Sequence, residues 1–311
     1  MIRRFLALTL LLAAVPGCDR AQAATPAPRS AATVLGGPGN QPGRFVKPRA
    51  VAVAPDGTIW VMDRSGRLQA FNDAGTYLRG WTMRDVEKGT PEDIEVDAEG
   101  NVLVTETHYA RVTVYSPAGE VVREWGSWGK DPGQFIYPVG IAIGTDGAVY
   151  VSEYGGNDRV QKFDREGRLL LALGSFGEEP GQLQRPEDLW VDAHDRVWVA
   201  DACNQRIQVF DGKDGRFLFS WGGEGDGPGK LRYPYDVAVA GDAVWVCEYG
   251  NHRLQKFTLE GKPLAVRGSV GRAIGELNFP WDFALDARGR VWVADTQNHR
   301  VQAFPTGEEG R

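Results

Sequence analysis

Histidine, cysteine and concentrated positive charge are scarce in this chain. Its 311 residues include four His and three Cys, and the 35 Lys and Arg are dispersed among 41 Asp and Glu. No Gly-x-Ser-x-Gly sequence occurs, and no Cys and His stand at a spacing recognisable as a catalytic pair. These absences argue against a familiar Ser or Cys nucleophile. They also argue against a nucleic-acid partner, which needs a basic stripe facing the phosphate backbone.

Long apolar runs are also missing, except near the start. Residues 5–15 form an apolar core after two arginines, and this core is too short to span a bilayer as a mature helix. The pattern predicts an export signal with two alternative cleavage sites. Residues 15–18 (VPGC) resemble a bacterial lipobox in which Cys18 is lipidated, whereas residues 21–23 (AQA) fit an ordinary signal peptidase site. We favour lipidation, because a lone Cys directly after the apolar core has no other evident purpose.

Both alternatives imply an exported protein at the periplasmic or extracellular face; lipidation of Cys18, the alternative we favour, would hold it to a bacterial membrane by a lipid anchor alone. We assign residues 1–23 to the signal, lipobox and start of the tether, and residues 24–32 to an Ala/Pro-rich tether. An oxidising compartment permits a disulfide between Cys203 and Cys247. The distance between strands of successive blades is usually too large for that bridge, so two separate thiols are the alternative.

What the chain has in abundance is a repeat. From residue 280 to residue 304, a proline opens three short β-rich runs separated by turns that carry Gly, Asp and Asn. The opening proline recurs at spacings of 43 to 48 residues, as Pro48, Pro91, Pro138, Pro186, Pro234 and Pro280. A period near 45 with several strands per unit is typical of a β-propeller blade. The fold class predicted is all-β, a propeller of six blades.

The two ends of the repeat array complement each other. Residues 33–40 (TVLGGPGN) match the end of a blade, although they precede the first one, and the last blade lacks a fourth strand after Phe304. We predict that residues 33–35 supply that outer strand and close the ring, because closure removes an exposed sheet edge. The propeller then spans residues 33–305, and residues 306–311 form a C-terminal tail.

The last two repeats carry a specific signature. Asn251-His252-Arg253-Leu254 and Asn298-His299-Arg300-Val301 resemble NHL repeats, and the resemblance covers about residues 33–304. It implies a six-bladed propeller but no single function, because the NHL family includes enzymes, sensors and protein- or RNA-binding modules. In the related peptidyl-α-hydroxyglycine lyases, histidines hold zinc, one of them typically just after a blade-opening proline. The corresponding positions here hold no histidine, so the resemblance does not extend to a three-His zinc site.

One acid and one arginine flank a turn in every repeat. The second run ends on an acid and the third begins with an arginine, which predicts a structural ion pair in each blade. These acids are Asp63, Glu106, Glu153, Asp201, Glu248 and Asp295.

In each repeat, two of the positions that follow the proline are candidates for a site. The position two after the proline holds Asp93, Asp188, Asp236 and Asp282 in four blades, but Ala50 and Gly140 in the other two. These carboxylates are expected to converge at one channel mouth, where they would hold a hard cation such as Ca²⁺ or else accept backbone N–H groups.

The position directly after the proline varies from blade to blade, as a ligand-facing position would. It holds Arg49, Glu92, Val139, Glu187, Tyr235 and Trp281. Tyr235 and Trp281 could form an aromatic stacking wall. The connector into the second blade departs from the pattern of the others and adds Met83 and Arg84 to this candidate set.

We therefore expect a non-catalytic, envelope-anchored, monomeric propeller that binds a protein, peptide or glycan at the channel mouth. The predicted ligand-binding residues are Arg49, Glu92, Glu187, Tyr235, Trp281, Met83 and Arg84. The alternative is a lyase or lactonase-like hydrolase that depends on a divalent cation in the central channel, and the Asp ring is its only local support.

Overall fold

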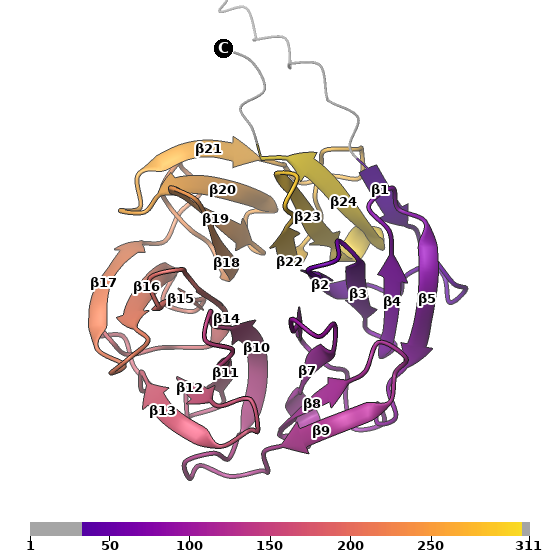
Figure 1. Ribbon diagram of the computed structural model, residues 1–311. Helices are drawn as coiled ribbons and strands as arrows, with labels where there is room; N and C mark the ends of the chain where they lie inside the picture. The colour runs from indigo at the N-terminus through magenta and orange to yellow at the C-terminus, as the bar shows by residue number, and fades with distance from the viewer. Residues whose placement is uncertain (1–32, 307–311) are drawn as a thin grey trace, which may run out of the picture.

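The chain folds into six four-stranded sheets arranged as blades around a central axis (Figure 1). The computed structural model describes residues 33–306, so the predicted signal, Cys18 and the tether lie outside the described residues. Each blade is an antiparallel meander whose innermost strand begins at a blade-opening proline or just beside it. The predicted all-β propeller with six blades is confirmed.

The strands are short and regular. Blades 1 to 3 comprise β2 (Pro48–Val53), β3 (Ile59–Asp63), β4 (Arg67–Phe71) and β5 (Tyr77–Thr82); β6 (Ile94–Val96), β7 (Val102–Glu106), β8 (Arg111–Tyr115) and β9 (Val121–Trp125); β10 (Tyr137–Ile143), β11 (Val149–Tyr154), β12 (Arg159–Phe163) and β13 (Leu169–Leu173). Blades 4 and 5 comprise β14 (Pro186–Val191), β15 (Arg196–Asp201), β16 (Arg206–Asp211) and β17 (Phe217–Gly222); β18 (Pro234–Ala240), β19 (Ala243–Glu248), β20 (Arg253–Thr258) and β21 (Pro263–Arg267). Blade 6 comprises β22 (Pro280–Leu285), β23 (Arg290–Asp295), β24 (Arg300–Pro305) and β1 (Thr33–Gly36). Two 3₁₀ turns, η1 (Thr107–Tyr109) and η2 (Thr296–Asn298), complete the elements.

The ring is closed by its own N-terminal strand. β1 pairs antiparallel with β24, from Thr33 opposite Ala303 to Gly36 opposite Arg300. Leu35 on β1 is 1% exposed and packs in a cluster that joins blade 6 to blade 1. The predicted closure of the ring is confirmed, and it covers the edge of β24 that would otherwise stand open.

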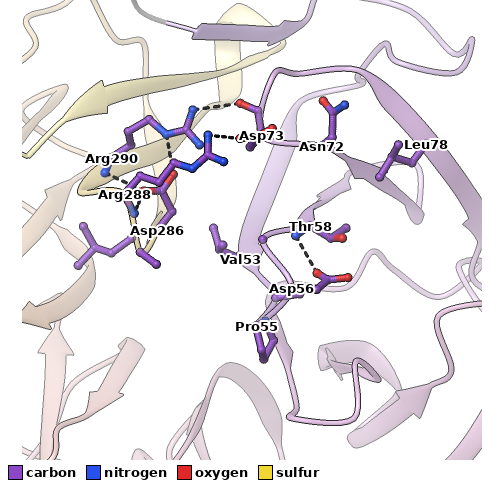
Figure 2. Close-up of a pocket in the computed structure, with 14 residues that line it drawn as sticks. Val53, Pro55, Asp56, Thr58, Asn72, Asp73, Leu78, Asp286, Arg288 and Arg290 are labelled. Carbon is purple, nitrogen blue, oxygen red and sulfur yellow. Dashed lines mark hydrogen bonds and ion pairs between the residues drawn. The ribbon is translucent and has the colours of Figure 1, made fainter.

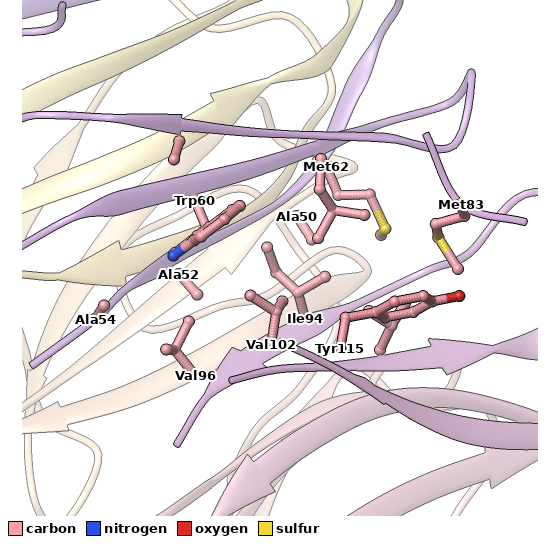
Figure 3. Packing of buried hydrophobic residues seen from close by; sticks show 13 residues of the cluster. Ala50, Ala52, Ala54, Trp60, Met62, Met83, Ile94, Val96, Val102 and Tyr115 are labelled. Atoms are coloured by element: carbon pink, nitrogen blue, oxygen red, sulfur yellow. The ribbon is translucent and has the colours of Figure 1, made fainter. Parts of the chain in front are cut away.

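The hydrophobic core lies between the blades. The second strand of each blade is buried on both faces, and four such strands carry a fully buried Trp, namely Trp60, Trp198, Trp245 and Trp292. Between blades 1 and 2, Trp60 and Met62 of β3 pack with Ile94 of β6 and Tyr115 of β8 (Figure 3). The blades therefore pack face to face, and none buries its apolar faces alone.

The ion pairs expected at the turns are present in all six blades. The guanidinium that opens the third strand lies 2.5–2.8 Å from the carboxylate that ends the second. In blade 5, Arg253 pairs with Glu248 and also donates hydrogen bonds to the carbonyls of Asp226, Gly227 and Lys230 in the connector. Each pair therefore ties a hairpin to the connector that precedes its blade.

Cys203 and Cys247 are both free thiols, so the disulfide considered from sequence does not form. Cys247 is buried in the core between blades 5 and 6. Within residues 33–306, no helix is long and apolar enough to cross a membrane.

Candidate binding site at the channel mouth

The innermost strands bring the residues that follow the prolines to one end of the ring. The Arg49 guanidinium lies 4.4 Å from the ring centre of Trp281, which makes a cation–π contact between blades 1 and 6. The same guanidinium forms an ion pair with Glu92 of blade 2. Arg49, Glu92 and Trp281 each directly follow a blade-opening proline, so the mouth lies at the N-terminal ends of the inner strands β2, β6 and β22.

Blades 5 and 6 supply an aromatic wall. The rings of Tyr235 and Trp281 meet edge to face with their centres 5.0 Å apart. Tyr249, which follows β19, stacks on Tyr235 at 4.5 Å and contacts Phe279 at 4.7 Å. Such contacts fix the orientation of large side chains, so this wall is formed before any ligand arrives.

Blade 4 supplies a second pair of opposite charges. Arg185 forms an ion pair with Glu187, and its guanidinium lies 5.3 Å from the ring centre of Tyr154 and 5.8 Å from that of Tyr235. The mouth is therefore lined by two Arg–Glu pairs and several aromatic rings from different blades. Tryptophan, tyrosine and arginine are the residue types that contribute most to binding at protein interfaces.

Sequence reasoning missed four of these residues. Arg185 and Phe279 each precede a blade-opening proline, and Tyr154 and Tyr249 follow the acid of the second strand. The repeat alignment held a usable signal, because both positions are as variable as the one after the proline.

Two predicted contact residues lie elsewhere. Met83 is 3% exposed and packs in the core between blades 1 and 2, because the irregular connector turns its side chain inward. Arg84 pairs with Asp85 and with Glu124 on β9, the outermost strand of blade 2. Met83 and Arg84 therefore take no part in the mouth that Arg49, Glu92, Glu187, Tyr235 and Trp281 form.

Directly inside the mouth, the inner-strand carboxylates converge. Asp93, Asp188 and Asp282 each present one oxygen, and these oxygens lie within 4.8 Å of one another. Gly140 makes room for this approach, since a Cβ on it would stand 2.6 Å from Oδ1 of Asp188. The expected convergence at the channel is therefore present for these three residues.

The inner-strand carboxylates also accept hydrogen bonds from backbone N–H groups, which is the alternative expected from the sequence. Asp93, Asp236 and Asp282 each accept a hydrogen bond from the backbone N–H of Ile141, Phe283 and Val51, respectively, at 2.6–2.8 Å. In each case the donor lies in the next blade around the ring. Asp188 differs, because the bond it accepts comes from its own neighbour, Leu189. Three of these carboxylates therefore link adjacent blades.

Burial raises the pKa of all four aspartates, and mutual repulsion raises it further for Asp93, Asp188 and Asp282. Burial also raises the pKa of Glu187 to about 7, against the opposing effect of Arg185. Like charges this close in a buried setting do not all ionise without a compensating cation or protons. The cluster therefore suits either shared protons or a bound positive charge.

A calcium ion takes six to eight oxygen ligands at 2.3–2.6 Å. Three carboxylates offer one oxygen each here, and Asp93 already accepts backbone N–H bonds on both of its oxygens. The cluster could hold a hard cation only if water or a ligand supplied the remaining oxygens.

A larger cavity opens at the other end of β2, between the turns of blades 1 and 6 (Figure 2). It measures about 560 Å³ and is bordered by Val53, Asp56 and Leu78 on one side and Leu285 on the other. Arg288 and Arg290 both reach Asp73 across it, and Arg290 also pairs with Asp286. No aromatic side chain of the described residues borders this cavity, so it lacks the stacking surface that the mouth offers a ligand.

A family model of the NHL repeat matches residues 183–210, 231–257 and 277–304, which fall in blades 4, 5 and 6. The match covers three of the six blades. The chain is a six-bladed propeller that contains NHL repeats. NHL repeat-containing protein 3 of Mus musculus is 45% identical over 60 residues, which cover 19% of this chain and 17% of that protein. The match thus spans less than a fifth of the relative's length.

Solved structures with the same architecture include enzymes and binding proteins. A streptogramin B lyase superposes with a TM-score of 0.63 at 14% identity, covering 88% of this chain and 97% of the lyase. A chain of a nidogen/laminin complex superposes with a TM-score of 0.55 at 19% identity, covering 70% and 79%. At these identities the likeness concerns the fold alone.

Proposed function

We propose that this NHL propeller is an exported, lipid-anchored module that binds a protein, peptide or glycan at the channel mouth. The observation that carries the proposal is the wall of aromatic rings and Arg–Glu pairs at one end of the inner strands. Trp281 stands at its centre, in contact with Arg49, Tyr235 and Tyr249.

The composition of this wall supports a binding role. Aromatic rings and arginines on a rigid scaffold provide large contact areas at a low entropic cost. NHL propellers commonly mediate protein interactions, and a propeller of the same architecture is found in a nidogen/laminin complex. A protein or peptide would place side chains between the rings, and a glycan would stack its sugar faces on Trp281 or Tyr235.

Affinity capture from envelope extracts, read by mass spectrometry, tests the proposal. Trp281→Ala and Arg49→Glu should each reduce recovery of the captured partner by about tenfold or more, the effect typical of a central interface residue. Arg288→Glu alters the cavity at the opposite end of the inner strands and is the matched control. Recovery equal to wild type for both mouth variants, with melting temperatures unchanged, would place the binding site elsewhere.

The second candidate is a divalent-cation-dependent lyase or lactonase-like hydrolase with its site in the channel. The observation that favours it is the approach of Asp93, Asp188 and Asp282 within 4.8 Å. Elemental analysis of purified protein separates the candidates: stoichiometric calcium or zinc that Asp188→Asn removes would support the enzyme, and metal-free protein that captures a partner would support the binding module.

A further inference from the structure

Beneath the aromatic wall lies a small cavity lined mainly by carboxyl groups. It is bordered by five carboxylates, two aromatic rings and one aliphatic side chain: Glu92, Asp93, Glu187, Asp188, Asp282, Tyr235, Trp281 and Val139. No lysine or arginine borders it. The glutamates have their own arginines at the mouth, but within residues 33–306 no Lys or Arg forms an ion pair with Asp93, Asp188 or Asp282.

We propose that this cavity receives one primary ammonium group of a peptide partner, the side chain of a lysine. The inference rests on the proposed function, since it names the group that a partner bound at the mouth would insert. Charge complementarity is its first support: a positive charge would stabilise the ionised aspartates beneath the mouth, and no Lys or Arg of residues 33–306 pairs with them.

The size of the cavity suits an ammonium. Its accessible volume of about 10 Å³ is close to the least that holds one water molecule, and an ammonium group is of similar size. A planar guanidinium is larger, and the two arginines at the mouth remain outside among the rings.

The acceptor geometry agrees with this assignment. The oxygens of Asp93, Asp188 and Asp282 lie within 4.8 Å of one another. An ammonium donates three hydrogen bonds, and at ordinary bond lengths its three acceptors stand about 4.6 Å apart. Asp188 has the most freedom to accept one, because, unlike Asp93 and Asp282, it accepts no backbone N–H from the next blade.

The aromatic rings suit the rest of a lysine side chain. Trp281 and Tyr235 stand above the carboxylates, where the apolar methylene stem of a lysine would pass. Both rings already accept a cation on the propeller itself, Arg49 on Trp281 and Arg185 on Tyr235. The site therefore offers apolar contact to the stem and carboxylates to the charge.

Calorimetric titration of the full chain with defined peptides tests the inference. The probes are Ac-Gly-Ser-Lys-Ser-Gly-amide, the same peptide with Gln in place of Lys, and the Gln peptide with a free N-terminus. We expect the Lys peptide to bind wild type at least about tenfold more tightly than the acetylated Gln peptide, the difference that a charge-assisted hydrogen bond gives. Asp188→Asn should abolish that preference, while Asp56→Asn, at the other end of the inner strands, should preserve it.

Three outcomes would overturn the inference. Equal binding of the Lys and acetylated Gln peptides would show that no lysine is recognised, and tighter binding of the free N-terminus would assign the cavity to a terminal amine. Calcium chloride alone that raises the melting temperature of wild type but not of Asp188→Asn, with no preference for the Lys peptide, would assign it to a metal.

Failure of the inference can be told from failure of the proposed function. Partner capture that needs Trp281 but not Asp188 would leave the binding function standing without the lysine. A lysine preference that needs Asp188, in a protein whose partner capture does not depend on Trp281, would leave the lysine site standing and contradict the proposed contact surface around Trp281.

Discussion

A backbone N–H of the following blade explains what the histidine of the NHL signature does here. The donor is the residue just before a blade-opening proline, and the acceptor is the residue just before the arginine of the preceding blade. In blade 5, Nδ1 of His252 accepts from Phe279 at 2.9 Å, and in blade 6, Nδ1 of His299 accepts from Lys47 at 3.2 Å. Blade 4 uses the amide oxygen of Gln205 for Tyr233. The histidine therefore links blades, and only its neutral form can accept this bond.

Acidification should weaken this link. Burial lowers the pKa of His252 from 6.5, so the folded state favours the neutral ring more than the unfolded state does. The stability that this preference contributes is present above pH 6.5 and is lost as the pH falls below it. His252→Gln, which copies the side chain of blade 4, should lose less melting temperature than wild type between pH 7.5 and pH 5.5. Thermal melts at the two pH values measure the difference, and identical losses in both proteins would contradict it.

At the scale of the blade, the ion pair at each turn joins a hairpin to a connector. Glu248 and Asp295 are fully buried, and their arginines also donate hydrogen bonds to carbonyl groups of the connector. A buried carboxylate without its partner is strongly destabilising, whereas an exposed pair contributes little. The main role of the ion pair in each blade is therefore to fix the hairpin against its connector.

Removing one such arginine should be costly. Arg253→Ala leaves Glu248 buried and unpaired and is expected to lower the free energy of unfolding by about 3–5 kcal/mol. Arg168→Ala is the matched control, because Arg168 and its partner Asp164 form a pair on the surface; the change there should be much smaller. Denaturant unfolding measures both, and similar losses for the two variants would refute a special role for the pair within the blade.

Elements of this kind are what the sequence predicts best. The prolines, the acid–arginine turns and the TVLG segment recur at fixed spacing, so blade count, ion pairs and closure follow from the repeat. The mouth is predictable only where it coincides with a repeat position, as at Arg49 and Trp281. Met83 was misplaced because its connector has no counterpart to align, so its direction depends on packing between blades 1 and 2.

At the scale of the whole molecule, the ring depends on one short strand. The other five blades are meanders of consecutive strands, but blade 6 takes β1 from the start of the described chain. β1 contributes four paired residues and buries Leu35 between blades 6 and 1. Without β1, the hydrophobic cluster between those blades loses a buried side chain and β24 presents an unpaired edge. The Leu35 cluster reaches the inner strands through Val51 of β2 and Ala284 of β22, and the N-terminal ends of these strands carry Arg49 and Trp281.

Two truncations therefore test the closure of the ring. A chain that begins at Thr33 keeps β1, and a chain that begins at Gly37 lacks it, so the pair isolates the four residues of the strand. Loss of the buried Leu35 and of the ladder should cost several kcal/mol and lower the melting temperature by about 10 °C. The shorter chain should also self-associate, since an unpaired edge is a template for another strand. Calorimetry and size-exclusion chromatography read the two effects. Two chains that melt within a few degrees of each other, both monomeric, would mean that the ring holds together without β1.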